Sequence, residues 1–416
     1  MSRVVVAFDI GKTNLKLIAF DRASGAEIWA RTEQNAPRQD GPYPHANIEA
    51  LEHFLHDGLA DAARDANGAL DGVVVTTHGA SGALLAGERL ALPVLDYEHD
   101  GPEETAEAYG ALRPSFAETL SPRLPGGLNL GAQLFWQQRR FAGAFDAATT
   151  FVTYPQFWAF KLCGVAATEV TSLGCHTDLW SPVESRFSSL VARAGWGKLM
   201  APTRPASDVL GLMRSDLARR LGLQAKAPIF CGIQDSNASL MPYLGGARSR
   251  SVISSGTWAI CFSFDGSFAG LDEMRDTLAN VDARGEPVLS ARFMGGREFD
   301  MLTGGVIATP SLDEITRVLE ARAMALPSFV TGSGPFPNGR GRWTTAPEAL
   351  TAGERYAAAS LYLALMSNVC LDLLAASGDT IIQGPFAHNG LFCDALASLS
   401  GRPVFRTDGQ TATAAG

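Results

Sequence analysis

The chain has 416 residues, which is long for one ordinary hydrophobic core, so we expect about two domains. Its formal net charge of -9 at pH 7 argues against nucleic acid or an anionic membrane as a partner, because both favour basic surfaces. The six cysteines form no C-x-x-C pair and no segment approaches about 18 uninterrupted apolar residues, which predicts a reduced, cytoplasmic protein without a zinc site, disulfide framework, signal peptide or membrane span.

Residues 4–21, VVVAFDIGKTNLKLIAFD, predict two strands joined by a tight turn. Gly11, Lys12 and Thr13 match the last letters of a nucleotide-binding P-loop, G-x-x-x-x-G-K-[ST]. The first glycine of that motif would fall at Val6, and the residues after the turn alternate as a strand does, rather than as a helix. The stretch is therefore predicted to be a hairpin and not a P-loop.

The turn of this hairpin has two interpretations. Its backbone N–H groups can form an anion-binding concavity, with the two lysines within reach of phosphate oxygens and the aspartate as a direct or water-mediated magnesium ligand. Alternatively, the aspartate and glycine serve only the turn, since both are common turn residues. The candidate ATP-binding residues here are Asp9, Gly11, Lys12, Thr13, Asn14 and Lys16, with Asp9 also the candidate metal ligand.

A third strand over about residues 26–32, a helix over about 47–64 and a buried strand, GVVVTTHG at 72–79, are expected after the hairpin. Sugar recognition needs polar side chains that converge on neighbouring hydroxyls, and these occur at the end of that strand and in the later segments PVLDYEHD and NLGAQLFW. A histidine at a strand end is more often structural, and the similar segment TEVTSLGCHTDLW can equally be a solvated loop. The candidates are His78, Gly79, Asp96, Glu98, His99, Asn129, Gln133 and Trp136.

Asp235 lies between an apolar strand and a helix expected to begin at about Ser236, in PIFCGIQDSNASL. It can be the N-cap of that helix, a position that favours aspartate. It can also be a general base, because a helix dipole would keep its carboxylate ionised and able to accept a hydroxyl proton. Phosphoryl transfer needs such a base together with bound phosphates and a metal ion.

The opening hairpin pattern occurs a second time in SRSVISSGTWAICFSFDG at 249–266, where the turn supplies Gly256 and Thr257. A helix over about residues 352–376 and a short apolar strand in GDTIIQGPFAHNG then repeat the order of the first half. The spacing of about 245 residues predicts a duplicated α/β domain rather than a solenoid, although any two α/β domains share such elements. A hinge is expected in YLGGARSR at 243–250.

Over essentially the whole chain, these segments resemble, in order, those of the FGGY carbohydrate kinases. FDIGKTNLKLIAFD and SSGTWAI are similar to the two phosphate loops of that family, CGIQDSNASL to its catalytic segment, QGPFAHNGLFCDALASLSGRPV to its adenosine segment, and TATAAG to the start of its last helix. The resemblance implies two actin-like ATPase (ribonuclease H-like) α/β domains with a nucleotide and sugar cleft between them. It places sugar binding, the first phosphate loop and the catalytic aspartate in 1–245, and the second phosphate loop and adenosine binding in 246–416.

The resemblance also implies roles for single residues, with Asp235 as the general base. The further residues that it assigns to the sugar or to ATP are Gly79, Gln234, Ser236, Gly256, Thr257, Gly384 and Asn389. Three segments depart from the family pattern. The adenosine segment keeps only the first Gly and the Asn of a Gly-Gly-Gly-Ser-x-Asn run, Gln234 stands where rhamnulokinases have a histidine, and ARFMGGREFD lacks the Asn and Gln that rhamnulokinases bring to substrate and nucleotide. The chain ends at Gly416, just inside a helix that normally continues in the family.

Within the family, SSGTW and THG followed by GALLAGERLALPV are most similar to rhamnulokinases and fuculokinases. The resemblance therefore implies a cytoplasmic kinase that uses ATP and Mg²⁺ to phosphorylate L-rhamnulose or L-fuculose at the C1 hydroxyl, with a homodimer as a compatible assembly. The alternatives are a kinase for a pentulose such as xylulose or ribulose, a hydrolase on the same fold, and a non-catalytic sugar- or nucleotide-binding protein.

Overall fold

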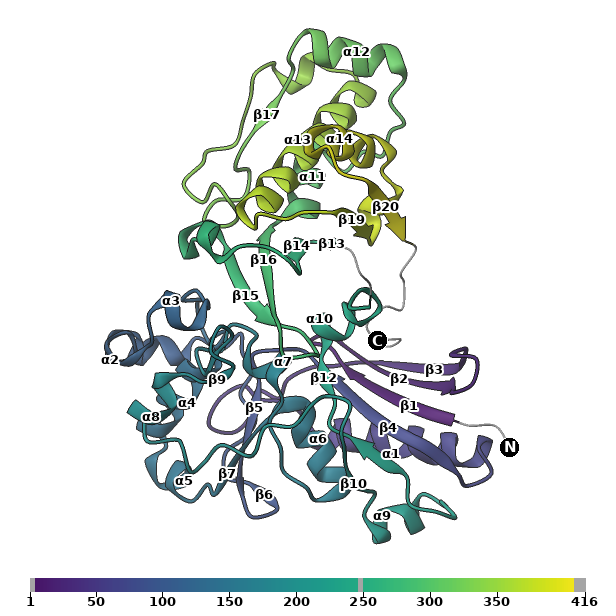
Figure 1. Cartoon of the computed structure of the whole chain (residues 1–416), viewed down its shortest axis with the longest axis vertical. Coiled ribbons are helices and arrows are strands. Elements are labelled where there is room, and N and C mark those ends of the chain that lie inside the picture. The colour runs from purple at the N-terminus through teal and green to yellow at the C-terminus, as the bar shows by residue number, and fades with distance from the viewer. Residues whose placement is uncertain (1–3, 246–249, 408–416) are drawn as a thin grey trace. The chain divides into compact units, whose positions relative to one another are not determined.

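The computed structural model describes residues 4–245 and 250–407 (Figure 1). They form two compact units, one made of residues 4–245 and 280–286 and the other of residues 250–279 and 287–407. Residues 246–249 of the predicted hinge and the segment TATAAG lie outside the described residues. Residues 280–286 come after the start of the second unit in the chain but belong to the first unit, and no pattern in the sequence predicted this.

The first unit is built on a mixed sheet in the order β10-β11-β4-β1-β2-β3, with β12 paired to β4. β1 and β2 form the predicted hairpin, and β4 runs parallel to β1 on its other side, so β1 and β4 end at the same edge of the sheet. The strands are β1 (Val4–Ile10), β2 (Asn14–Asp21), β3 (Glu27–Gln34), β4 (Leu70–Thr77), β10 (Val209–Leu212), β11 (Pro228–Phe230) and β12 (Ile233–Gln234).

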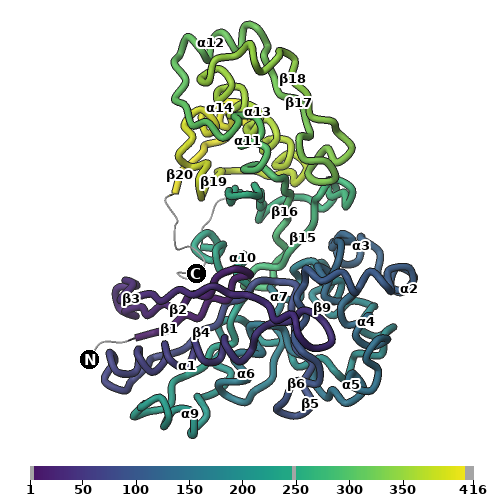
Figure 2. The backbone as a smooth tube through the Cα atoms, turned by 180° about the vertical axis from the view of Figure 1, so that it is seen from behind, coloured from purple at the N-terminus to yellow at the C-terminus, as the bar shows by residue number. Residues whose placement is uncertain are grey.

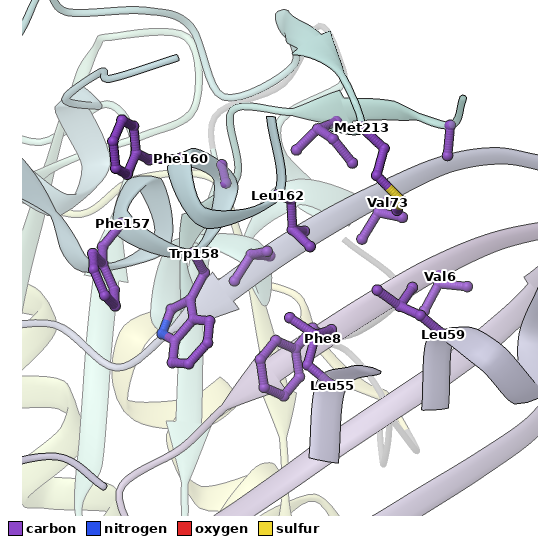
Figure 3. Packing of buried hydrophobic residues seen from close by; sticks show 14 of the residues in the cluster. Val6, Phe8, Leu55, Leu59, Val73, Phe157, Trp158, Phe160, Leu162 and Met213 are labelled. Carbon is purple, nitrogen blue, oxygen red and sulfur yellow. The ribbon is translucent and has the colours of Figure 1, made fainter. Parts of the chain in front are cut away.

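The core of the first unit lies between this sheet and the helices α1 (Ile48–Asp65) and α6 (Tyr154–Cys163). In both overall views α1 lies along β1 and β2 (Figures 1 and 2). Phe8 of β1 is fully buried beside α1 and meets the edge of Trp158 of α6, with ring centroids 5.7 Å apart (Figure 3). Burial of one such aromatic side chain contributes about 2 kcal/mol, so this packing fixes the strand that carries Asp9.

Short elements between β4 and β11 build a second core cluster in the same unit. Their sheet, β6-β5-β7, follows directly on the end of β4. The strands are β5 (Gly82–Ala86), β6 (Arg89–Leu90), β7 (Thr150–Thr153), β8 (Trp180–Ser181) and β9 (Arg186–Phe187). The helices of this region and of the end of the unit are α2 (Ala106–Leu112), α3 (Phe116–Thr119), α4 (Leu130–Arg140), α5 (Ala142–Asp146), α7 (Val170–Leu173), α8 (Ser189–Arg193), α9 (Ser215–Arg220) and α10 (Asp235–Ala238).

The second unit repeats the arrangement of the first. Its sheet has the order β15-β16-β14-β13-β19-β20, in which β13 and β14 form a hairpin and β19 runs parallel to β13. The strands are β13 (Arg250–Ser255), β14 (Ala259–Ser263), β15 (Thr277–Val281), β16 (Pro287–Phe293), β17 (Ala325–Leu326), β18 (Arg342–Trp343), β19 (Asp379–Gln383) and β20 (Val404–Thr407). The helices are α11 (Gly295–Thr303), α12 (Leu312–Glu320), α13 (Ala352–Leu373) and α14 (Gly390–Ser400). The predicted duplication of an α/β unit is confirmed.

Helix α13 is the long helix predicted for the second half. It begins in a capping box, in which the Thr351 hydroxyl accepts from the Glu354 N–H and the Glu354 carboxylate accepts from the Thr351 N–H. It is also the single helix within residues 4–245 and 250–407 that is long and apolar enough to cross a membrane, and 61% of its most apolar window is buried inside the structure. Burial of that kind is found in the core helix of a globular unit.

Candidate active site

The first turn, residues 11–14, is closed by backbone hydrogen bonds and is open to solvent. The Gly11 N–H donates to the Asn14 carbonyl at 2.9 Å, and a Cβ on Gly11 would lie only 3.0 Å from that oxygen. Asn35 of the next loop donates from its side chain to the Gly11 carbonyl and from its backbone to the Thr13 carbonyl, each at 2.8 Å. Thr13 and Asn14 themselves are exposed. The turn is therefore fixed in shape while its outer atoms remain available to a ligand.

Asp9 and Lys16 lie opposite each other in the β1–β2 ladder, directly below this turn. Burial raises the pKa of Asp9 to about 6, and the charge of Lys16 partly offsets that rise. Within the part of the chain that the structure describes, no group of three or more His, Cys, Asp or Glu side chains could hold a metal ion. A single carboxylate suits Mg²⁺ that keeps several waters and binds substrate phosphates, so Asp9 fits such an ion.

Asp235 is the first residue of α10, at the end of β12, which pairs with the last two residues of β4. The N-cap is Gln234, whose side-chain oxygen accepts from the Asn237 N–H at 3.1 Å, so the interpretation of Asp235 as the N-cap is wrong. The Asp235 carboxylate instead accepts from the Ser236 N–H at 2.6 Å and from the Gln234 amide. Gln234 and Ser236, both predicted to lie at the site, thus orient the carboxylate of the candidate base.

Burial raises the pKa of Asp235 to about 7, although the Ser236 N–H lowers it, and the negative charge of Asp9 raises it further. The prediction that a helix dipole keeps this carboxylate fully ionised is wrong, because burial raises its pKa to about 7 and α10 has only four residues. A pKa near neutrality suits a general base, which must be both ionised and basic at the working pH.

A buried chain of hydrogen bonds leads to the Asp235 segment from α7. The Glu169 carboxylate accepts from the Thr171 hydroxyl at 2.5 Å, and the same hydroxyl accepts from the Gln234 N–H at 3.1 Å. Glu169 and Thr171 are fully buried. Both lie in the polar segment TEVTSLGCHTDLW, which the sequence left open as a solvated loop, and the structure places them in the interior.

The segment before Asp235 is fixed from a second side. The Gln156 amide on α6 donates to the Cys231 carbonyl at 2.9 Å and to the Gly232 carbonyl at 3.1 Å. Gly232 has φ +85°, and a Cβ there would lie 2.3 Å from the Val75 carbonyl oxygen on β4. Only glycine fits at this position, and this close approach puts the segment directly beside the end of β4. Sequence reasoning did not single out Gln156.

His78 and Gly79 follow β4, close to Asp235. The His78 N–H donates to the Ile10 carbonyl at 2.9 Å, so His78 continues the β1–β4 ladder beyond the strand. Its ring lies 5.2 Å from that of Tyr97, and burial lowers its pKa, so an uncharged imidazole faces the site. A Cβ on Gly79 would lie 3.5 Å from the Gln234 amide nitrogen. The two candidates are thus brought together with the segment that carries the base.

Lys12 does not extend over the turn that carries it. Its ammonium pairs with Asp96 and, at 3.2 Å, with Glu98, and it lies 4.7 Å from the centre of the Tyr97 ring. These partners belong to the segment PVLDYEHD, which was predicted to contact sugar. The structure therefore joins a candidate ATP residue to candidate sugar residues, and Tyr97 is a member of this group that the sequence did not single out.

Gln133 on α4 is buried, and its amide nitrogen donates to the Ala80 carbonyl at 2.6 Å and to the Gly127 carbonyl. Those bonds support the loop directly after Gly79, so the side chain positions this loop. Direct contact of Gln133 with a sugar stays a prediction.

The second turn lies between β13 and β14. The Gly256 N–H donates to the Trp258 carbonyl at 2.9 Å, and Thr257 is exposed, as are Thr13 and Asn14 of the first turn. A Cβ on Gly296, in the first turn of α11, would lie 2.2 Å from the Gly256 carbonyl oxygen. A second peptide segment thus lies directly against this turn.

The adenosine segment begins where β19 ends. Gly384 has φ +82°, and a Cβ there would lie 2.1 Å from the Ser255 carbonyl oxygen. The Ser255 hydroxyl donates to the Gln383 carbonyl at 2.6 Å and accepts from the Phe386 N–H at 3.0 Å. The end of β13 and the glycine that is kept from the family pattern therefore touch within the second unit.

Asn389, the other residue kept from that pattern, is buried at the N-cap of α14. Its side-chain oxygen accepts from the Phe392 N–H at 3.1 Å, and its nitrogen donates to the Ser360 hydroxyl at 2.9 Å. These bonds fix α14 against α13, and a contact of Asn389 with adenosine stays a prediction.

Comparisons with known proteins agree with this geometry. Residues 247–416 match the family described as Carbohydrate kinase FGGY, C-terminal domain. The crystal structure of a carbohydrate kinase from Novosphingobium aromaticivorans is 36% identical in sequence and superposes with a TM-score of 0.92, covering 99% of this chain and 90% of that one. The crystal structure of ligand-bound xylulose kinase from Lactobacillus acidophilus, 13% identical, superposes with a TM-score of 0.78 over 99% of this chain and 88% of that one.

L-fuculokinase of Salmonella typhi is 27% identical over 271 residues, which cover 62% of this chain and 56% of that enzyme. The chain thus aligns with little more than half of the length of this relative. Taken together, these similarities show that the chain belongs to the FGGY carbohydrate kinases, and they confirm the duplicated actin-like fold.

Proposed function

We propose that the protein transfers the terminal phosphoryl group of ATP to a terminal hydroxyl of a ketose sugar. The observation that carries this proposal is the half-buried carboxylate of Asp235, with a pKa of about 7, beside the strand end that bears His78 and Gly79. A carboxylate of that basicity at an edge rich in polar side chains suits the removal of a proton from an alcohol.

In the proposed reaction, Asp235 accepts the proton of the sugar hydroxyl, and the hydroxyl oxygen attacks the γ-phosphorus of ATP. The bond between that phosphorus and the β,γ-bridging oxygen breaks, and ADP leaves with the electron pair. The N–H groups of the first turn and Lys16 bind phosphate oxygens, as do Gly256 and Thr257 of the second turn. Asp9 would hold Mg²⁺, which would supply positive charge at the phosphates.

The proposed sugar is a deoxyhexulose such as L-fuculose or L-rhamnulose, phosphorylated at C1. The similarity to L-fuculokinase supports this choice. We also propose that the protein works in the cytoplasm, where its six free cysteines would remain reduced. Its formal net charge of -9 favours small-molecule partners over nucleic acid.

A coupled assay of ADP release across deoxyhexuloses, ketohexoses, pentuloses and polyols tests the proposal, with the phosphorylated position determined by NMR. We expect release that depends on a ketose and a product with phosphate on a terminal carbon. ADP release that is independent of any sugar would favour a hydrolase and overturn the proposal, as would the absence of turnover with every compound. Phosphorylation of a pentulose alone would keep the kinase and replace the sugar.

A further inference from the structure

The two lysines of the first hairpin point to different chemistry. Lys16 lies on β2 opposite Asp9, where its charge acts on the carboxylate that fits a metal ion. Lys12 lies only four positions earlier, yet its ammonium contacts Asp96 and Glu98, more than eighty residues away in the sequence. A lysine that binds phosphate would be expected to lie beside Asp9, as Lys16 does, rather than in the contacts that Lys12 makes.

Burial shows that the pair of Lys12 and Asp96 is a fixed part of the site. The side chains of Lys12 and Asp96 are 23% and 9% exposed, whereas that of Glu98 is 65% exposed. The Asp96 carboxylate also accepts from the Glu98 N–H at 3.1 Å, which fixes its orientation. If Lys12 turned away to a phosphate, it would leave Asp96 buried without its cation, which is strongly unfavourable.

The same pair borders the residues around the proposed base. A small cavity in the first unit is lined by, among others, Lys12, His78, Ser81, Asp96, Tyr97 and Tyr154. Tyr97 lies under the Lys12 ammonium and close enough to Asp235 to feel its charge: burial raises the pKa of the phenol to about 12, with smaller contributions from Glu98 and Asp235. Lys12 is therefore near the place where the acceptor hydroxyl must lie.

We infer that Lys12 recognises the sugar rather than ATP, and that its pairing with Asp96 and Glu98 selects uncharged sugars over sugar acids. This inference rests on the proposed function. The ammonium donates and the Asp96 carboxylate accepts, so the pair matches two neighbouring hydroxyls, each of which can do both.

The charges around the site exclude an anionic sugar. Because two carboxylates surround Lys12, no net positive charge remains there for a substrate carboxylate. Asp235, when ionised, adds negative charge on the side of the base. A sugar acid would meet repulsion from several carboxylates, whereas an uncharged ketose would form hydrogen bonds with them.

The test compares Lys12→Met with Lys16→Met as its matched control, in steady-state assays with the best ketose from the screen. We expect Lys12→Met to raise the KM for the sugar at least tenfold and to leave the KM for ATP within threefold of the wild-type value. Lys16→Met is expected to raise the KM for ATP at least tenfold and to leave the KM for the sugar within threefold of the wild-type value. A rise confined to the KM for ATP in Lys12→Met would overturn the inference while the kinase activity stands.

A second measurement uses D-gluconate as an anionic probe. The wild-type kcat/KM for D-gluconate should be at least a hundredfold below that for the ketose, and Asp96→Asn should narrow this ratio about tenfold by removing one buried negative charge. Because the ratio is taken within one protein sample, partial unfolding of the variant does not change it. A wild-type preference for D-gluconate, or an unchanged ratio in Asp96→Asn, would overturn the inference. Absence of any turnover in the wild type would overturn the proposed function and this inference with it.

Discussion

Replacement of Thr171 by valine tests whether the buried hydrogen-bond chain from Glu169 holds the segment of the proposed base, Asp235. Valine has nearly the shape of threonine but lacks the hydroxyl, which donates to Glu169 at 2.5 Å and accepts from the Gln234 N–H at 3.1 Å. Each buried polar group left without a partner costs about 1–3 kcal/mol. We therefore expect a loss of about 3 kcal/mol in the free energy of unfolding, which for a unit of this size lowers Tm by roughly 6–12 °C.

The same substitution should lower kcat, because the Gln234 N–H lies one residue before Asp235 and a small shift of a catalytic group can reduce the rate about a hundredfold. Thr171→Ser is the control, since it keeps the hydroxyl and loses only a methyl group, at a cost of about 1 kcal/mol. The measurements are thermal unfolding followed by circular dichroism and kcat with the best sugar. If the valine and serine variants had equal Tm and equal kcat, the hydrogen-bond chain would have no part in holding the site.

Three further predictions concern the base, the metal and the second unit. Since the Asp235 pKa is raised to about 7, and the base must be ionised, kcat/KM should fall about tenfold per pH unit below pH 7; a profile that stays flat down to pH 5 would contradict this. Chelation of Mg²⁺ by EDTA should abolish sugar-dependent ADP release, and added Mg²⁺ should restore it; activity that persists in EDTA would exclude the metal role given to Asp9. Gly384→Ala should destabilise the second unit and raise the KM for ATP more than tenfold, because the new Cβ would lie 2.1 Å from the Ser255 carbonyl oxygen. The control Gly401→Ala, also at positive φ but with open space around it, should lower the free energy of unfolding by only about 1 kcal/mol. Similar Tm and KM values for the two variants would refute the steric argument.

The parts of the fold that sequence reasoning reached are those set by local patterns. Alternation of apolar residues around a short turn predicted both hairpins, and the repeated order of hairpin, helix and buried strand predicted the duplication. The position of Asp235 between a strand and a helix was predicted from the local sequence, whereas its place beside the end of β4 was seen only in the structure. Each hairpin and each strand-to-helix junction depends on residues that are close together in the sequence, so the local sequence pattern predicts it.

The features that sequence reasoning missed depend on contacts between distant segments. Lys12 was assigned to ATP from its place in the turn, and its ion pair with Asp96 spans 84 positions. Gln156 and Thr171 form hydrogen bonds from two other helices to the segment that leads to Asp235. The raised pKa of Asp235 arises from burial, which spacing along the chain does not reveal. Gln156 is a polar residue inside the apolar helix YPQFWAFKLC, a placement that could have indicated such a contact but was not used in the sequence analysis.

The central claim is that Asp235 is the general base of a sugar kinase, and the Asp235→Asn variant tests it most directly. The amide has nearly the same size but cannot accept the hydroxyl proton, so sugar-dependent ADP release should fall at least a thousandfold. The Kd of ADP with Mg²⁺, measured by isothermal titration calorimetry, should stay within threefold of the wild-type value. An Asp235→Asn enzyme that phosphorylates the sugar at a rate near that of the wild type would contradict the assigned mechanism.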